Sequence, residues 1–319
     1  MKLRYIIPTF ATAFLLLLTG PLLGQQEFQF TQFMHNQLFI NPAYAGARDM
    51  TSLLAIYRNQ YAGFEGSPQS RLVSINTPIL GQKVGFGFSV SNHTAGITNL
   101  WYGSMAYSYK LQITKDAAVR FGLQGSIRYY GFDFEDPAIF IRDGGDPSLS
   151  ENMETKYAGN FGAGLYFTYK QVYFGLSVPH FFPNEITLNR TNVVDLVAQE
   201  VPHFYAIAGV MLPVSEKLHL KPAILAKYVQ NAPFDLDANI SMVFDYRITA
   251  GVSYRHGGDD LVESIDLLLM YQHKSIGIGL AYDVGISGLG AESGGSWEVL
   301  LRYDFLKEQD NIANPRFFF

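Results

Sequence analysis

The stretch "VGFGFSVS" (84–91) alternates apolar and small residues without a break, and it sets the architecture of the whole chain. Val84, Phe86, Phe88 and Val90 would lie on one face of an extended chain, with glycine and serine on the other. A strict period of two predicts a β-strand. Two neighbouring stretches repeat the pattern, "WYGSMAYSYKL" (101–111) and "VRFGLQGSIRYY" (119–130).

The same period continues to the end of the chain and predicts about fourteen strands. They are expected near 51–58, 69–76, 84–91, 101–111, 119–130, 161–169, 171–178, 203–212, 217–228, 235–243, 246–255, 264–272, 275–283 and 296–305. The first two alternate less cleanly, so their facing stays open. Neither an amphipathic helix of any length nor a domain boundary is visible.

The polar face of these strands is mostly small, which separates a membrane barrel from a soluble β-sandwich. A sandwich would turn a charged face to water, whereas this face is largely Gly, Ser, Ala, Thr and Gln. Its few charges include Arg120, Arg128, Lys110, Lys221, Asp237, Arg247, Arg302 and Asp304. The apolar face has aromatic residues towards its ends, at Trp101, Tyr169, Tyr254, Tyr271, Tyr282 and Tyr303. Aromatic girdles and a polar interior predict an all-β fold, a closed antiparallel transmembrane β-barrel of the outer membrane.

Connection lengths support this count. Connections after even-numbered strands are short, as at 170–171, 213–216, 245–246 and 274–275, and those after odd-numbered strands are longer, as at 131–159, 179–201, 256–262 and 285–295. Short periplasmic turns that alternate with longer external loops are typical of such barrels. Both termini are then expected in the periplasm.

Composition excludes several classes of function. The chain has 319 residues, 15% aromatic and 16% charged, with a net charge of −5 and no cysteine. Disulfides, thiolate metal sites and cysteine nucleophiles are therefore excluded. The acidic balance gives no reason to expect nucleic-acid binding.

Four segments are expected. Residues 1–24 resemble a secretory signal peptide, with Lys2 and Arg4 before an apolar run, which implies Sec-type export. Residues 25–50 mix aromatics with amides, too apolar for water and too polar for lipid. They are expected to pack into or across the periplasmic opening, with Pro42 and Gly46 turning the chain into the first strand; the alternative is a disordered leader. The barrel covers 51–305, and 306–319 forms a periplasmic tail.

Catalytic and ligand-binding motifs are unconvincing. Ser91, Asn92 and His93 are adjacent on one strand end and do not form a triad. The loops 142–148 and 257–260 carry Ca²⁺-ligand types, but solvated turns use the same residues. The glycines of "GFGFSV" are interpreted as strand residues facing the lumen or its contents. No cofactor, metal or small-molecule substrate is expected. Charges in the lumen either line a water-filled pore or pair with one another and with a plug.

Several motifs together resemble the PorP/SprF family of the Bacteroidetes type IX secretion system. These are "QFTQFMHNQLFINPAYAG" (29–46), "YRNQYAGFEGSP" (57–68), "GFGFSVSNHTAG" (85–96) and the ending "NPRFFF" (314–319). Tyr61 stands where the family often has Trp. The motif residues, expected to be plug or partner contacts, are Gln32, Phe33, Asn36, Asn41, Pro42, Tyr44, Gly46, Tyr57, Arg58, Asn59, Gln60, Gly63, Phe64, Gly66, Pro68, Pro315, Arg316 and Phe317.

The resemblance implies a non-enzymatic outer-membrane barrel of the secretion and gliding machinery. Its partner would be either the periplasmic ring components or the C-terminal domain of a secreted surface adhesin. A general porin or hydrophobic-solute channel is the alternative. At the other end, Phe305 fits the terminal aromatic of an assembly signal, which leaves Phe317 to Phe319 as a partner handle or an extended signal.

Overall fold

The computed structural model describes residues 28–48, 50–132, 156–190, 193–230, 232–257, 260–286 and 293–306. Within these ranges no helix has the length and apolar character needed to cross a membrane. The strands are β1 (Ser52–Asn59), β2 (Gln69–Ile79), β3 (Val84–Ala95), β4 (Thr98–Gln112), β5 (Ala117–Phe132), β6 (Lys156–Tyr169), β7 (Val172–Val178), β8 (Asn184–Arg190), β9 (Val193–Glu200), β10 (His203–Val210), β11 (Leu212–Pro213), β12 (Leu218–Val229), β13 (Asp235–Phe244), β14 (Ile248–Gly257), β15 (Asp260–His273), β16 (Ile276–Gly285) and β17 (Ser296–Asp304).

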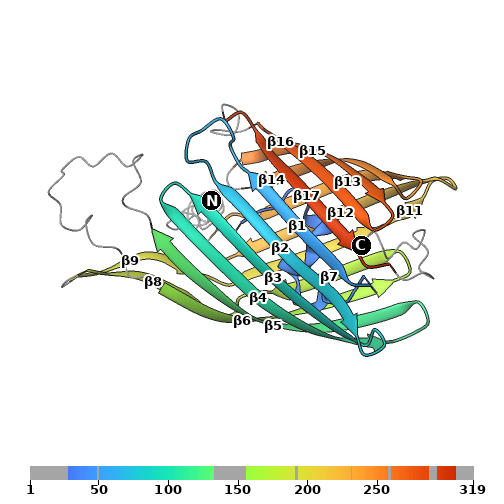
Figure 1. Ribbon diagram of the computed structural model, residues 1–319, viewed down its shortest axis with the longest axis horizontal. Helices are drawn as coiled ribbons and strands as arrows, with labels where there is room; N and C mark the ends of the chain where they lie inside the picture. The colour runs from blue at the N-terminus through green and yellow to red at the C-terminus, as the bar shows by residue number, and fades with distance from the viewer. Residues whose placement is uncertain are drawn as a thin grey trace, which may run out of the picture.

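The large sheet closes on itself as an antiparallel barrel (Figure 1). The first strand pairs with the last, from Ser52↔Asp304 to Asn59↔Trp297. The two-residue β11 only continues the pairing of β10 with β12, so fourteen strands form the wall. This confirms the predicted fold class and strand number. Closure leaves no unpaired edge in the wall, as a bilayer requires.

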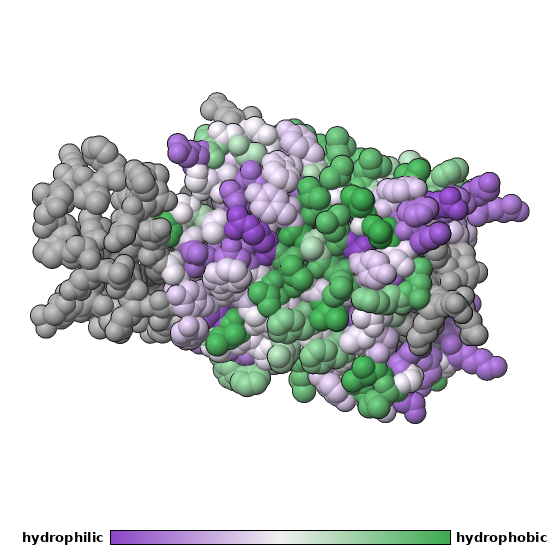
Figure 2. Space-filling model, viewed as in Figure 1, coloured by the Kyte–Doolittle hydropathy of each residue, from purple (hydrophilic) through white to green (hydrophobic). Residues whose placement is uncertain are grey.

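Alternation along the strands sets their facing, as predicted. Phe86 and Phe88 point outward, whereas Gly85, Gly87 and Ser89 are buried inside. All six expected girdle aromatics are exposed on the outside. Figure 2 shows the result as a hydrophobic band across the middle of the barrel, with polar residues gathered towards both ends.

The weak alternation of the first two strands has a structural cause. Their inward positions include Leu54, Ile56 and Leu72, which are buried in an apolar cluster with Phe30. Outward positions such as Leu53 and Val73 are apolar too because they face the outside. Both faces of these strands therefore read as hydrophobic in sequence.

Connections differ in length at the two ends of the barrel, which are called here the short-turn end and the long-loop end. At the short-turn end, the residues between β13 and β14 include Asp245 and Tyr246, both with positive φ, as a tight twisted hairpin requires. At the long-loop end two connections are shorter than predicted, only 96–97 and 258–259. The 179–202 connection also contains an unpredicted hairpin, β8–β9, which lies outside the barrel sheet.

Candidate functional site: the segment inside the barrel

Residues 28–48, called the inner segment, lie inside the barrel wall (Figure 1). Near one end of the segment, Gly46 donates its N–H to Asn76 Oδ1 at 2.5 Å, near the short-turn end of β2. At the other, the ring of Phe28 stacks on His93, with 3.3 Å between the centroids, near the long-loop end of β3. The segment therefore runs lengthwise through the lumen.

Three short helical turns build the inner segment: η1 (Phe33–His35), α2 (Gln37–Ile40) and η2 (Pro42–Tyr44). Asn41 is extended, as a residue before proline prefers, and its Oδ1 accepts the N–H of Ala43 at 2.9 Å. Its Nδ2 donates to the carbonyl oxygens of Leu165 at 2.9 Å and Leu176 at 3.3 Å. One amide thus caps η2 and attaches it to two wall strands.

The wall is hollowed by glycines where the inner segment touches it. A Cβ atom at Gly85 would overlap the carbonyl oxygen of Ala45, and one at Gly122 would overlap the main chain of Ala43. The same holds for Gly87 against Leu38, Gly164 against Asn41 and Gly279 against Gln32. The interpretation of "GFGFSV" as glycine facing the contents of the lumen is confirmed for Gly85 and Gly87.

Apolar side chains of the inner segment join the core of the barrel. Phe33, Met34, Leu38, Ile40 and Tyr44 are buried together with inward residues of the wall. Those wall residues include Tyr166, Tyr173, Ile207, Met211, Leu225 and Val243. Full burial of each large apolar side chain contributes about 1.5–3 kcal/mol, so this contact contributes substantially to holding the segment.

Carboxylates of the wall bind the segment towards its long-loop end. Glu298 accepts the backbone N–H groups of Thr31 at 2.8 Å and Gln32 at 3.0 Å, one on each oxygen. The hydroxyl of Thr31 donates to Asp283 at 2.7 Å. Arg58 lies between the two acids, 2.7 Å from Asp283 and 3.7 Å from Glu298. The arginine of the "YRNQ" motif thus compensates the charges that hold the segment.

A second set of polar contacts holds the short-turn end of the segment. Arg120 donates to the carbonyl oxygen of Gly46 at 2.7 Å, and Ser108 donates to that of Ala45 at 2.6 Å. Arg48 pairs with Asp304 at 3.1 Å. Lumen charges therefore pair with one another and with the segment at the positions named here, which favours the second of the two interpretations left open by the sequence.

The predicted motif residues divide into two places. Gln32, Phe33, Asn36, Asn41, Pro42 and Tyr44 are buried in the inner segment. Gly46 lies near its end with φ +65°, and Arg58 faces it from β1.

The others brace the long-loop end instead. Gly63 donates its N–H to Ser293 at 2.7 Å, and Gly66 accepts from Gly96 at 3.0 Å. Pro68 accepts the N–H of Gln60 at 2.8 Å, and Asn59 accepts the hydroxyl of Ser67 at 3.0 Å. The ring of Tyr57 packs on that of Trp297, with 5.0 Å between the centroids. Phe64 is exposed. Pro315, Arg316 and Phe317 lie outside the described residues.

Sequence reasoning missed Asp283, Glu298 and Arg48 as contacts of the segment. The two acids sit at inward positions of "AYDVG" and "SWEVL", and a carboxylate on an inward face was the available signal. Arg247 was placed among the lumen charges, and this is wrong. It lies in a turn, 65% exposed, near Asp245 at 3.6 Å.

The candidate catalytic residues have structural partners. His93 bonds to Ser70 at 2.8 Å and Ser91 at 2.9 Å beneath the ring of Phe28, and Asn92 donates to Asn99 at 2.7 Å. Within the described ranges, no group of three or more His, Asp or Glu side chains is arranged to hold a metal.

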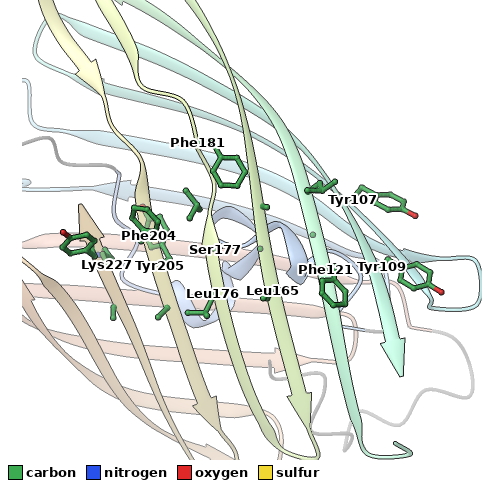
Figure 3. Close-up of a pocket in the computed structure, with 18 of the residues that line it drawn as sticks. Tyr107, Tyr109, Phe121, Leu165, Leu176, Ser177, Phe181, Phe204, Tyr205 and Lys227 are labelled. Carbon is green, nitrogen blue, oxygen red and sulfur yellow. The ribbon is translucent and has the colours of Figure 1, made fainter. Parts of the chain in front are cut away.

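On the outer face, an apolar groove of about 750 Å³ crosses β4 to β12 (Figure 3). Small residues such as Ala163 and Ala206 line it between aromatics that include Phe121, Phe181 and Phe204. Gly122, Gly164 and Ser177 also line it, and the inner segment contacts the same three residues from inside. Only one layer of main chain separates the groove from the segment.

A family model described as "Type IX secretion system membrane protein PorP/SprF" matches residues 22–303. Among solved structures, the chain is similar to the Acinetobacter baumannii outer membrane protein Omp33 (4% identity, 80% of this chain and 98% of that chain, TM-score 0.47). It is also similar to the Pseudomonas putida toluene transporter TodX (13%, 84% and 93%, 0.45) and to the monoaromatic hydrocarbon channel CymD (11%, 90% and 96%, 0.48). No curated protein matches the sequence.

Proposed function

Because the chain belongs to the PorP/SprF family of type IX secretion system membrane proteins, we propose that it is a sealed, non-enzymatic barrel that binds a protein partner. It is an outer-membrane barrel of the secretion machinery, and the proposal concerns what such a barrel does. In this proposal the inner segment is a plug, and the lumen is a structural interior instead of a transport path.

The observation that carries the proposal is the attachment of the inner segment to the wall on all sides. It bonds to β1, β16 and β17 through Arg58, Asp283 and Glu298, and to β5, β6 and β7 through Arg120 and Asn41. The core cluster fills the space between these contacts. A segment held by buried charge-assisted hydrogen bonds would not move aside for a solute.

Of the two partner classes, the secreted adhesin has more structural support. In outer-membrane barrels the long loops face the exterior, where an adhesin is displayed. There β8 and β9 pair with each other, and among the described residues neither pairs with a further strand. A two-stranded sheet with free edges is marginal alone and suited to accept a strand from a partner domain.

Replacement of residues 185–199 by a short Gly/Ser connection, which retains Asn184 and the Arg128 partner Glu200, tests this role. Cross-linking in cells that express the variant should lose the contact to the adhesin C-terminal domain while the barrel still inserts. A change of the turn at 245–246 to Asn-Gly serves as the control at the opposite end. If the hairpin variant retains the adhesin and the unchanged barrel cross-links only to periplasmic ring components, the ring role replaces this one.

The hydrophobic-solute channel is the second candidate, favoured by the outer groove. A solute in that groove would need a lateral route into the lumen, but the inner segment lies against Gly122, Gly164 and Ser177 directly behind it. Planar-bilayer conductance separates the candidates. Silence of the full chain, together with steady conductance of a variant lacking residues 28–46, supports the plug. A steady open channel in the full chain contradicts it.

A further inference from the structure

Basic side chains in the half of the lumen nearer the long loops are matched by carboxylates. The pairs are Arg58–Asp283, Arg255–Asp237, Lys227–Asp237 and Arg128–Glu200, at 2.7–2.8 Å. This half shows how the protein treats a buried charge: it supplies an opposite charge within hydrogen-bonding distance. Burial of an unmatched charge would cost several kcal/mol.

The half nearer the short turns is different. The Nη2 of Arg48 and the Nε of Arg302 both lie 3.1 Å from the same oxygen, Oδ2 of Asp304. The other oxygen of Asp304 accepts the hydroxyl of Ser52 at 2.7 Å. All three charged side chains are at most 4% exposed. Two guanidinium groups therefore share one carboxylate in a region away from water.

Each guanidinium has a donor left over. In the described part of the chain, Nε of Arg48 and Nη1 of Arg302 have no hydrogen-bond partner, although both atoms are buried. The Nη2 of Arg302 is satisfied by Gln272 at 2.7 Å, so the orphan donor is a specific atom and not a whole disordered side chain. Buried unsatisfied donors are uncommon. Nε of Arg58 is another in the described residues, but Arg58 has the carboxylate of Asp283 at 2.7 Å, whereas Arg48 and Arg302 share one carboxylate.

Two further basic residues lie nearby. Lys221, 1% exposed, lies within electrostatic range of both arginines. His35 of the inner segment has Lys221, Arg302 and Arg48 as its charged neighbours. Two guanidinium groups against one carboxylate leave a net positive charge at Asp304, which favours a negatively charged group over a neutral acceptor.

From these observations we propose that Arg48 and Arg302 form an anion site that takes a carboxylate group at the short-turn end of the lumen. A carboxylate provides two acceptor oxygens for two donors, and its pairs with arginine are the stronger, charge-assisted kind. The site joins the end of the inner segment to the wall, because Arg48 belongs to that segment and Arg302 to β17.

The carboxylate has two potential sources. One is a partner or solute that approaches from the short-turn side. The other is the chain itself, since Leu306, the last described residue, packs against the core cluster and the sequence continues with Glu308 and Asp310. Glu308 and Asp310 follow Leu306 by two and four residues, and an extended chain of that length spans about 7–14 Å.

An anion titration of the full chain in detergent tests the site and distinguishes the sources. Acetate replaces chloride at constant ionic strength, and the midpoint of thermal unfolding is recorded for the natural chain and for the E308Q/D310Q variant. A saturable rise of a few degrees is expected in at least one of them. A rise already in the natural chain assigns the site to an outside carboxylate. A rise only in E308Q/D310Q assigns it to the chain's own tail.

Arginine variants make the test specific. Arg302→Gln in the responding background should abolish the acetate response, and Arg247→Gln, an exposed turn residue, should retain it. Arg48→Gln, outside the strands, repeats the measurement if Arg302→Gln does not fold. Absence of a saturable response in both backgrounds, or an unchanged response in the arginine variants, overturns the proposal.

Discussion

Gly122 of β5 lies directly against the main chain of Ala43, with no space between them for a Cβ atom. The contact joins a wall strand to the η2 turn of the inner segment. It means that the inner face of the barrel is shaped for this particular segment.

Gly122→Val should displace the segment while the outward face of β5 stays unchanged. The added side chain would collide with backbone, which cannot turn aside as a flexible side chain can. Overpacking should lower the free energy of unfolding by about 1–3 kcal/mol. The expected results are therefore a lower unfolding midpoint and new bilayer conductance. Gly159→Val is the matched control, because a Cβ there meets nothing within 4 Å. Equal behaviour of the two variants would contradict a fitted segment.

Glu298→Gln should loosen the long-loop end of the segment. The amide keeps one acceptor oxygen for Thr31 or Gln32 but removes a charge next to Arg58. Arg58 keeps Asp283, so the main cost is one buried backbone N–H left without an acceptor, about 1–3 kcal/mol. Thermal unfolding followed by heat-dependent gel mobility measures this loss. Asp245→Asn, in an exposed pair, should shift the midpoint little, and a similar shift in both would refute the anchoring role.

Asn41→Ala should remove the cap of η2 and both bonds to the wall. A lost cap costs about 1 kcal/mol, and each lost hydrogen bond to the wall adds about 0.5–1.5 kcal/mol. Asn41→Ser separates the two effects, because serine keeps an N-cap acceptor for Ala43 and is too short to donate to Leu165 and Leu176. Its stability, from chemical denaturation, should fall between those of the natural chain and the alanine variant.

His35 should make stability depend on pH. Burial, with Lys221, Arg302 and Arg48 nearby, holds the pKa of His35 well below its ordinary value. The folded state therefore binds fewer protons than the unfolded state once pH falls below that ordinary value, about 6.5. The contribution of neutral His35 to the free energy of unfolding is fully present above about pH 6.5. It falls by up to about 1.4 kcal/mol per pH unit below that pH.

The unfolding midpoint between pH 7.5 and 5.5 is the measurement. His35→Gln should make the decline over this range less steep, because the contribution of the histidine is removed. His273→Gln, at the short-turn end of β15, should leave it unchanged. A decline that persists in full in His35→Gln would assign the pH dependence to other groups.

The period of two was enough to predict the strand number, the facing of most strands and the closed barrel, because each of these depends on a local alternation. It was not enough for pairs such as Arg58 with Asp283, which depend on how the first and penultimate strands meet after closure. The hairpin β8–β9 was not predicted, because its sequence has no clear alternation that would distinguish it from a loop. The facing of β1 was obscured by Leu54 and Ile56, whose partner Phe30 lies outside the sheet.

The inner segment precedes every strand in the chain, yet its polar anchors Asp283, Glu298 and Asp304 belong to the last two strands. The N-terminal segment therefore makes these polar contacts only after the last two strands of the chain have folded. These three anchors come into place only when the last two strands join β1 at the seam between β1 and β17. Anchoring of the inner segment therefore depends on closure of the cylinder, and chains that lack the final hairpin should fail at both.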